Sequence, residues 1–268
     1  MQASIIISYY KNLSTLELIL RALDSQSAKN HFEVIVSEDD NDTATVDLLN
    51  SLKAILHFPI IHISQTDSGF RKCIALNHSI ESANTDFLIF IDGDCIPHKK
   101  FVASYLQRKT PKTVLYGRRV MLSESISKKI LFSKNISLIH LFNLIAFKCK
   151  RIEEGIYFPL VNKMIQKTKS NMLLGCNMGI NKADLLAING FDEDYLFPGG
   201  GEDSDIEWRL KKIEGIKFTS MKFVAIVYHL YHPERFATVQ QIKSTVFMNK
   251  KINDGNFFCK NGLTKIAS

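Results

Sequence analysis

Two hydrophobic periods alternate along the first half of the chain. Apolar residues recur at helical spacing in residues 13–23 and 73–83, and a further helix is expected to begin at Thr43. Short, continuous apolar runs rich in β-branched and aromatic residues lie at 4–10, 32–36, 60–64 and 87–91. Such runs predict buried strands, and strands that alternate with helices at this spacing indicate βαβ units in a largely parallel sheet.

The pattern of the second half is less regular. Residues 113–121 and 224–229 are predicted as strands, and residues 171–181 as a strand with a turn. Short helices are predicted at 182–189 and 203–213. Basic and apolar residues alternate along 126–169, and the stretch 130–151 within this segment is predicted to form a helix. Because no repeat or low-complexity linker interrupts the chain, we expect one continuous domain.

The composition limits the class of protein. The 268 residues are 46% hydrophobic and 23% charged, close to the average for soluble globular proteins. No uncharged apolar run reaches 18 residues, and MQASIIISYY lacks the basic start of a secretory signal, so we expect a cytoplasmic protein. The cysteines number five, an odd count, and include no C-x-x-C pair, which disfavours a disulfide framework and a cysteine-based zinc site. The net charge of +7 fits ordinary solubility, or attraction to nucleotide phosphates, an anionic membrane or nucleic acid.

Acidic residues follow the ends of the predicted strands. In an open parallel sheet, ligands bind outside the carboxyl ends of the strands, so these acids are expected to gather at one edge. Asp92-Gly93-Asp94 comes directly after the strand 87–91, and its two carboxylates suit Mg²⁺ or Mn²⁺ that also holds substrate phosphates. Alone, the same pattern also forms ordinary polar turns.

The two preceding loops carry further polar groups. Glu38-Asp39-Asp40 offers carboxylates that either accept a hydrogen bond from an imide N–H, such as that of uracil, or cap the following helix. Arg71 and Lys72 either neutralise a diphosphate or form a solvated basic pair.

In the second half, three glycines at 199–201 precede Glu202 and Asp203. Acids in the first turn of a helix are favoured by its dipole, and a carboxylate so placed can act as general base towards a sugar hydroxyl. The glycines allow close backbone approach, and the segment 197–201 is expected to move over a bound substrate. His229 and His232 follow the last predicted strand, and they are either packed histidines or ligands that complete a metal site.

Taken in order, these segments resemble a known family. SIIISYY, FEVIVSEDDND, QTDSGFRKCIALN and FLIFIDGDC are similar to the nucleotide-sugar half of family 2 glycosyltransferases with the GT-A fold. GCNMGINKADLLAINGFDEDYLFPGGGEDSDIEWRL resembles the acceptor-side segment shared by galactosyltransferases and chondroitin-polymerase modules. The resemblance covers residues 3–120 and 171–235. It implies an α/β fold of GT-A type, with a mostly parallel nucleotide-binding sheet flanked by helices and an acceptor-side subdomain.

The resemblance also divides the single domain. Residues 1–122 form the nucleotide-sugar-binding half, 123–170 a helical insertion, 171–235 the acceptor and catalytic half, and 236–268 a helical C-terminal tail. The implied function is an inverting, metal-dependent transfer of a hexose or N-acetylhexosamine from a UDP-sugar to a saccharide or lipid-linked saccharide, in surface polysaccharide synthesis.

The resemblance assigns roles to particular residues. Asp203 is the implied catalytic base, and Glu202 contacts acceptor or donor sugar. Asp94 and either His229 or His232 are the implied ligands of Mn²⁺ or Mg²⁺. The implied donor contacts are Asp39, its neighbour Glu38, Arg71, Asn77, Asp92 and Gly93.

Two other classes of function compete with this interpretation. A non-catalytic sugar-nucleotide- or glycan-binding module is disfavoured because binding alone requires no base such as Asp203. A nucleic-acid-binding protein is disfavoured because the chain lacks a recognised motif and places acids where phosphates would bind. The basic, apolar insertion either packs over the core or lies on an anionic membrane, which would place the protein peripherally on the inner face of the cytoplasmic membrane.

Overall fold

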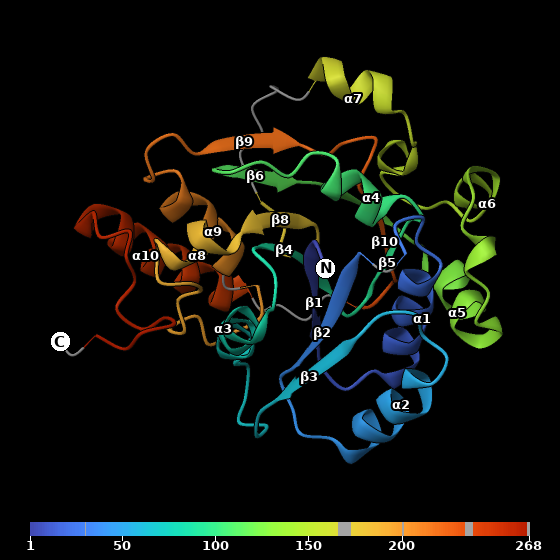
Figure 1. The fold of residues 1–268 in the computed structure, drawn as a ribbon, viewed down its shortest axis with the longest axis horizontal. Helices are drawn as coiled ribbons and strands as arrows, with labels where there is room; N and C mark the ends of the chain where they lie inside the picture. Colours follow the sequence, from blue (N-terminus) through green and yellow to red (C-terminus); the bar gives the residue numbers. More distant parts are fainter. Residues whose placement is uncertain (30, 166–172, 200, 234–237, 267–268) are drawn as a thin grey trace.

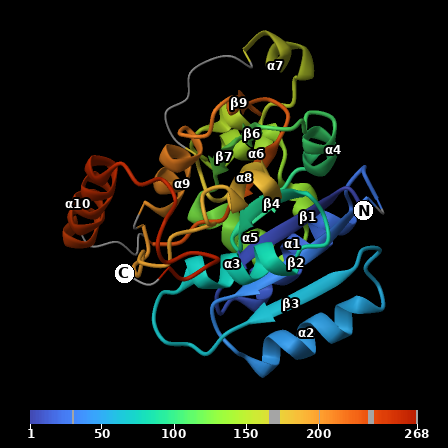
Figure 2. The ribbon, with the colours of Figure 1, turned by 60° about the vertical axis from the view of Figure 1, so that its left-hand side comes forward.

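The computed structural model describes residues 1–268 except 30, 166–172, 200, 234–237 and 267–268. A seven-stranded sheet runs through the molecule in the order β3-β2-β1-β4-β8-β6-β9, and Figures 1 and 2 show β3 and β9 at its two edges. Its strands are β1 (Ala3–Tyr9), β2 (Phe32–Glu38), β3 (Ile60–Ser64), β4 (Phe87–Asp92), β6 (Thr113–Tyr116), β8 (Met178–Asn181) and β9 (Lys217–Ser220). Only β8 runs antiparallel to its neighbours, which confirms the predicted α/β class with a mostly parallel sheet.

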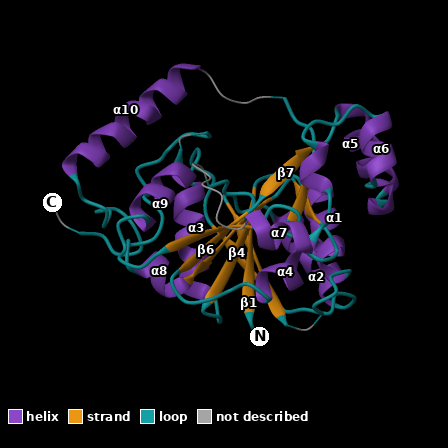
Figure 3. Cartoon of the chain, turned by 90° about the horizontal axis from the view of Figure 1, so that it is seen from above, coloured by secondary structure: helices purple, strands orange, loops and turns teal. Residues whose placement is uncertain are grey.

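Helices cover both faces of this sheet (Figure 3). Successive strand residues point to opposite faces, so Ile5 and Ile7 of β1 pack into one hydrophobic layer and Ile6 into the other. The first layer includes α1 (Leu13–Asp24), α2 (Thr43–Lys53) and α4 (Phe101–Leu106). The second includes α3 (Lys72–Ser82), α8 (Lys182–Leu186), α9 (Glu202–Leu210) and Phe247 of α10 (Thr238–Asp254). Neither α4 nor β9 was predicted from the sequence pattern.

The strand predicted at 113–121 is divided between two sheets. Its first part is β6, and its second part is β7 (Arg118–Met121), which joins β10 (Ile226–His229) and β5 (Cys95–Pro97) in a three-stranded sheet. Asn177 fills the break: its amide donates to the carbonyls of Arg118 at 2.7 Å and Ala225 at 2.9 Å. A Cβ at Gly117 would overlap this amide, so glycine is required where the strand changes sheets.

The helix predicted at 130–151 is wrong as a single element. The insertion contains α5 (Glu124–Ser133), the 3₁₀ turns η1 (Ile136–Leu138) and η2 (Ile152–Gly155), α6 (Leu141–Ala146) and α7 (Pro159–Ile165). Lys134, Lys148 and Arg151 adopt left-handed backbone angles between these elements, which interrupt the helical path. The end of the predicted insertion, 166–170, lies outside the described residues. The tail predicted as helical at 236–268 is a helix only as far as Asp254.

A buried ionic network fixes α9, the helix that begins with Glu202 and Asp203. Arg209 is completely buried, and its Nε donates to Asp205 at 2.6 Å. Its Nη1 donates to the carbonyls of Ile188 at 2.8 Å and Gly190 at 2.7 Å. Lys251 of α10 adds a second cation 2.5 Å from Asp205. Removal of one member of such a buried set leaves charge without compensation, which is costly.

We expect Arg209→Ala to lower the free energy of unfolding by about 3–5 kcal/mol, because Asp205 loses one of its two cations and two carbonyls lose their donor. Urea unfolding followed by circular dichroism measures the change. Arg21→Ala, which removes an exposed pair with Glu17, is the matched control and should cost at most about 1 kcal/mol. Equal losses in the two variants would show that the buried network contributes little to stability.

Candidate active site

The site lies where β1, β2 and β4 end. The parallel register sets Ser8 opposite Asp92 on one side and Ser37 on the other, so the acids that follow β2 and β4 reach the same edge. After β4 the chain turns tightly against β1, and the N–H of Gly93 donates to the carbonyl of Ser8 at 2.7 Å. A Cβ at Gly93 would lie 2.9 Å from that carbonyl oxygen, so the turn that presents Asp94 requires glycine.

Asp94, His229 and His232 form a cluster whose potential ligand atoms all lie within 4.8 Å of one another. The Nε2 atoms of His229 and His232 lie 3.4 and 3.3 Å from the same Asp94 carboxylate oxygen. The N–H of Leu230 donates to the carbonyl of Asp94 at 2.9 Å, which fixes the end of β10 beside the acidic turn. Burial alone would raise the pKa of Asp94, but the two histidines outweigh it and lower that pKa to about 2.

The histidine orientations fit metal binding. The Nδ1 of His232 lies 2.9 Å from the carbonyl of Pro233, which only accepts hydrogen bonds, so Nδ1 carries a proton and Nε2 is the ring nitrogen that would bind a cation. His229 presents its own Nε2 to the same oxygen from a buried position. One carboxylate and two imidazoles form a mixed oxygen and nitrogen donor set, which suits a divalent transition metal better than Mg²⁺, a cation that prefers oxygen ligands.

Asp39 is held at the end of β2 by the loop that follows β3. One carboxylate oxygen accepts from the Gln65 amide at 2.6 Å and the other from the backbone N–H of Arg71 at 2.7 Å. Burial raises the pKa of Asp39 above its ordinary value, while these hydrogen bonds act in the opposite direction. The Arg71 guanidinium donates in turn to the carbonyl of Thr66. The predicted contacts Asp39 and Arg71 are therefore brought together.

Two other predicted donor contacts point elsewhere. Glu38 is completely buried, and its oxygens bond to the Thr45 hydroxyl at 2.6 Å and to His62 at 2.7 Å. The Asn77 amide exchanges hydrogen bonds with the backbone of Phe191 and also donates to Glu193. Both side chains join neighbouring elements to one another, and the structure does not bring them to the acidic edge.

Glu202 and Asp203 begin α9 and meet the acidic turn through Lys72. The Lys72 ammonium lies 3.0 Å from Asp92 and 3.3 Å from Glu202, a residue 130 positions further along the chain. Burial alone would lower the pKa of Lys72, but Asp92, Glu202 and Asp203 raise it well above its ordinary value, so the side chain stays cationic. Sequence reasoning considered Lys72 only as one of a basic pair and missed this bridge.

Asp203 is a carboxylate whose pKa is raised by its surroundings. Its carboxylate accepts from the backbone N–H groups of Gly175 at 3.2 Å and Ser204 at 2.8 Å. Burial and the negative charge of Glu202 raise the pKa of Asp203 to about 6, and the nearby Lys72 opposes this rise. The preceding Gly201 has a φ of +82°, a left-handed angle that favours glycine. Gly200, within the segment expected to move, lies outside the described residues.

Two cavities meet at this edge. One is lined by Asp92, Gly93, Asp94 and His232, and the other by Lys72, Glu202 and Asp203; Ser8 lines both. The metal-type cluster and Asp203 therefore border neighbouring cavities that share Ser8.

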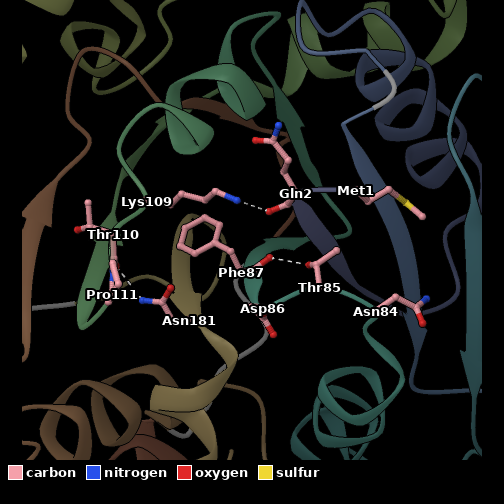
Figure 4. A pocket seen from close by; sticks show the side chains of 10 residues that line it. All are labelled: Met1, Gln2, Asn84, Thr85, Asp86, Phe87, Lys109, Thr110, Pro111 and Asn181. Atoms are coloured by element: carbon pink, nitrogen blue, oxygen red, sulfur yellow. Dashed lines mark hydrogen bonds between the residues drawn. The ribbon is translucent and has the colours of Figure 1, made fainter.

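A separate pocket lies at the opposite edge, where β1 and β4 begin (Figure 4). Lys109 reaches across it to the carbonyl of Gln2 at 2.7 Å, and Asp86 is the one carboxylate among the residues that line it. Ligands of parallel sheets bind at the carboxyl ends of the strands, so the candidate active site is the acidic edge.

Comparisons with known proteins show the family of the chain. The chain matches the profile of glycosyl transferase family 2 over residues 4–183, and that of the N-terminal domain of galactosyltransferase over residues 160–233. It is 26% identical to chondroitin synthase of Escherichia coli over 245 residues, which is 86% of this chain and 35% of that enzyme. The chain thus spans about a third of the length of this relative.

Solved structures show the same fold. A mannosyltransferase from Pyrobaculum calidifontis, in complex with GDP-Man and Mn²⁺, has a TM-score of 0.64 at 13% identity, over 94% of this chain and 64% of that one. GalNAc-T7 with UDP, GalNAc and Mn²⁺ has a TM-score of 0.64 at 14% identity, over 93% of this chain and 48% of that one. The resemblance found in the sequence is confirmed: the chain belongs to glycosyl transferase family 2 and is a transferase with the GT-A fold.

Proposed function

We propose that the chain transfers one hexose or N-acetylhexosamine from a UDP-sugar to a hydroxyl of a saccharide or lipid-linked saccharide, with inversion, in surface polysaccharide synthesis. The observation that carries the proposal is the Lys72 bridge, which joins the donor-side Asp92 to Glu202 beside Asp203. A module that only binds sugars has no use for a partly buried carboxylate whose pKa is raised to about 6 next to a metal-type cluster.

Asp94, His229 and His232 are the residues that would hold the cation. When bound, a divalent cation supplies positive charge that stabilises the leaving diphosphate. The mixed donor set favours Mn²⁺ over Mg²⁺. Mn²⁺ is also the ion in the complexes of the mannosyltransferase and of GalNAc-T7.

Asp203 is the proposed catalytic base. As the acceptor oxygen bonds to the anomeric carbon, the bond from that carbon to the diphosphate breaks and its electron pair leaves with the nucleoside diphosphate. Asp203 takes the proton of the acceptor hydroxyl. Attack on the face opposite the leaving group inverts the anomeric centre, by the geometry that governs inverting hydrolases. A carboxylate with a pKa of about 6 is ionised at neutral pH and more basic than an ordinary aspartate.

Asp39 and Arg71 are proposed to receive the nucleotide. The Asp39 carboxylate is oriented by Gln65 and by the Arg71 backbone, and it can accept the imide N–H of uracil. Guanine also presents N–H groups to a carboxylate, and one structural neighbour binds GDP-Man. The donor panel below therefore includes both nucleotides.

The first experiment measures nucleoside diphosphate release from UDP- and GDP-sugars with and without Mn²⁺. We expect slow, metal-dependent hydrolysis of one UDP-sugar even without the true acceptor. Asp203→Asn keeps the shape of the side chain but loses the base, and should reduce release by about 10²–10⁴-fold. Asp94→Ala should reduce it by at least about 10²-fold.

Glu214→Gln, an exposed carboxylate remote from the acidic edge, is the matched control and should match wild type. Unchanged release in Asp203→Asn would remove that residue from the proposed mechanism. Binding of a UDP-sugar without turnover, even when saccharide acceptors are supplied, would favour the binding-module interpretation.

The pH profile tests the coupling of Lys72 to Asp203. A base with a pKa of about 6 must be ionised to act, so kcat should fall as the pH falls through about 6. Lys72 holds the pKa of Asp203 down, so Lys72→Met should raise that pKa and move the acid limb of kcat to higher pH.

Lys72→Arg keeps the charge and should retain the wild-type profile. Lys109→Met, at the opposite edge of the sheet, should leave the profile unchanged. An acid limb that stays in place in Lys72→Met would contradict the electrostatic role of this ammonium.

Metal binding tests the histidine cluster directly. His229→Ala and His232→Ala should each weaken Mn²⁺ affinity by about tenfold or more, because each removes a donor from the set. Isothermal titration calorimetry with Mn²⁺ alone measures the affinity independently of turnover. His57→Ala, an exposed histidine paired with Asp24, should bind Mn²⁺ like wild type. Wild-type affinity in either variant would exclude that histidine as a ligand.

A further inference from the structure

Two adjacent helices of the insertion expose large apolar side chains at one end of the molecule. Figures 1 and 3 show α5 and α6 side by side, away from α10. Ile126 and Ile130 of α5 and Leu144 of α6 pack into the core, so the other sides of both helices face outward. The exposed fractions are 94% for Phe132, 75% for Phe142, 58% for Ile145 and 52% for Leu141. These four residues are named the α5–α6 face below.

The charges around this face have one predominant sign. Residues 123–152 contain six Lys or Arg residues and one acid, Glu124. Lys128, Lys129 and Lys148 are all exposed, and the Lys129 ammonium lies 5.7 Å from the centre of the Phe147 ring. Cations interleaved with exposed phenylalanines on short amphipathic helices are typical of segments that lie in the interface of an anionic bilayer.

We propose that the α5–α6 face docks on the surface of a bilayer that contains anionic phospholipid. Exposed apolar side chains gathered on neighbouring elements mark interaction sites, and the lysines around them complement phosphate headgroups. No helix among the described residues is both long enough and apolar enough to cross a bilayer. Docking therefore buries the aromatic side chains at the depth of the headgroups.

The same helix also borders the active site. Leu131 of α5 lines the cavity that contains Asp92 and Asp94, and the next residue, Phe132, belongs to the α5–α6 face. The N–H of Tyr231 donates to the Ser127 hydroxyl at 2.9 Å, which ties the loop between the two cluster histidines to α5. Docking thus sets the mouth of this cavity at the membrane surface. If the proposed function holds, the acceptor class is then a lipid-linked saccharide; the docking itself does not depend on it.

Vesicle sedimentation tests the docking with the whole chain. Wild type is expected to sediment with phosphatidylcholine vesicles that contain a third of phosphatidylglycerol, and to bind pure phosphatidylcholine at least about tenfold more weakly. High salt should release it. The triple variant Phe132→Ser, Phe142→Ser and Ile145→Ser should lose at least about tenfold in affinity for the anionic vesicles.

The matched control also carries three exposed apolar-to-serine changes, but away from α5 and α6: Leu186→Ser, Ile242→Ser and Val246→Ser. It should bind vesicles like wild type. Thermal unfolding verifies that both triple variants are folded, and hydrolysis of a soluble donor should be equal in both and in wild type. Absence of that hydrolysis in wild type would count against the proposed function and leave the vesicle result standing.

Three outcomes would overturn the docking proposal. The first is wild type that stays in the supernatant with anionic vesicles. The second is equal sedimentation of wild type and the α5–α6 triple variant, or equal binding to neutral and anionic vesicles. The third is a concentration-dependent dimer without lipid that the triple variant abolishes, since the α5–α6 face would then pack against a second copy of this chain.

Discussion

The active edge depends on one partly buried positive charge, the ammonium of Lys72. Asp92, Glu202 and Asp203 arrive from segments far apart in the sequence, and their carboxylates would repel one another at this edge without compensation. The Lys72 ammonium lies within 3.3 Å of both Asp92 and Glu202. It therefore holds the amino-terminal end of α9 against the turn after β4, and it limits the rise in the pKa of Asp203. The Lys72 contact that joins α9 to the turn after β4 therefore also influences the protonation of the proposed base, Asp203.

The strand register of the sheet determines which side chains reach the acidic edge. A parallel register that pairs Ser8 with Asp92 and with Ser37 brings the loops after β2 and β4 to one level. Gly93 then allows the chain to turn against β1 and to present Asp94 to the histidines that end and follow β10. The buried pair of Arg209 and Asp205, with the carbonyls of Ile188 and Gly190, fixes α9 further along the helix. The geometry of the acidic edge therefore depends on packing contacts that lie outside it.

The sequence predicted those parts of the structure that local patterns determine. Continuous apolar runs identified β1, β2, β3 and β4, and the ends of β2 and β4 located Asp39 and Asp94. The three glycines at 199–201 located the acids that begin α9. Long-range contacts and unusual backbone angles decided the rest. The break in 113–121 depends on Asn177, and the interruptions within 130–151 depend on left-handed residues that a helical hydrophobic pattern does not reveal. Glu38 and Asn77 look like site residues in sequence, but buried partners take up their hydrogen bonds. Lys72 was missed as a bridge because its second partner lies 130 positions away.

One helix of the insertion, α5, connects the exposed surface to the candidate active site. α5 contacts the acidic cavity through Leu131, the histidine loop through Ser127, and solvent through Phe132. The helix that would enter the headgroup region is therefore also the helix that lines the cavity of Asp92 and Asp94 and accepts the hydrogen bond from Tyr231, next to His232. Docking on a bilayer would bring the proposed metal site close to the membrane surface, where a lipid-linked acceptor lies.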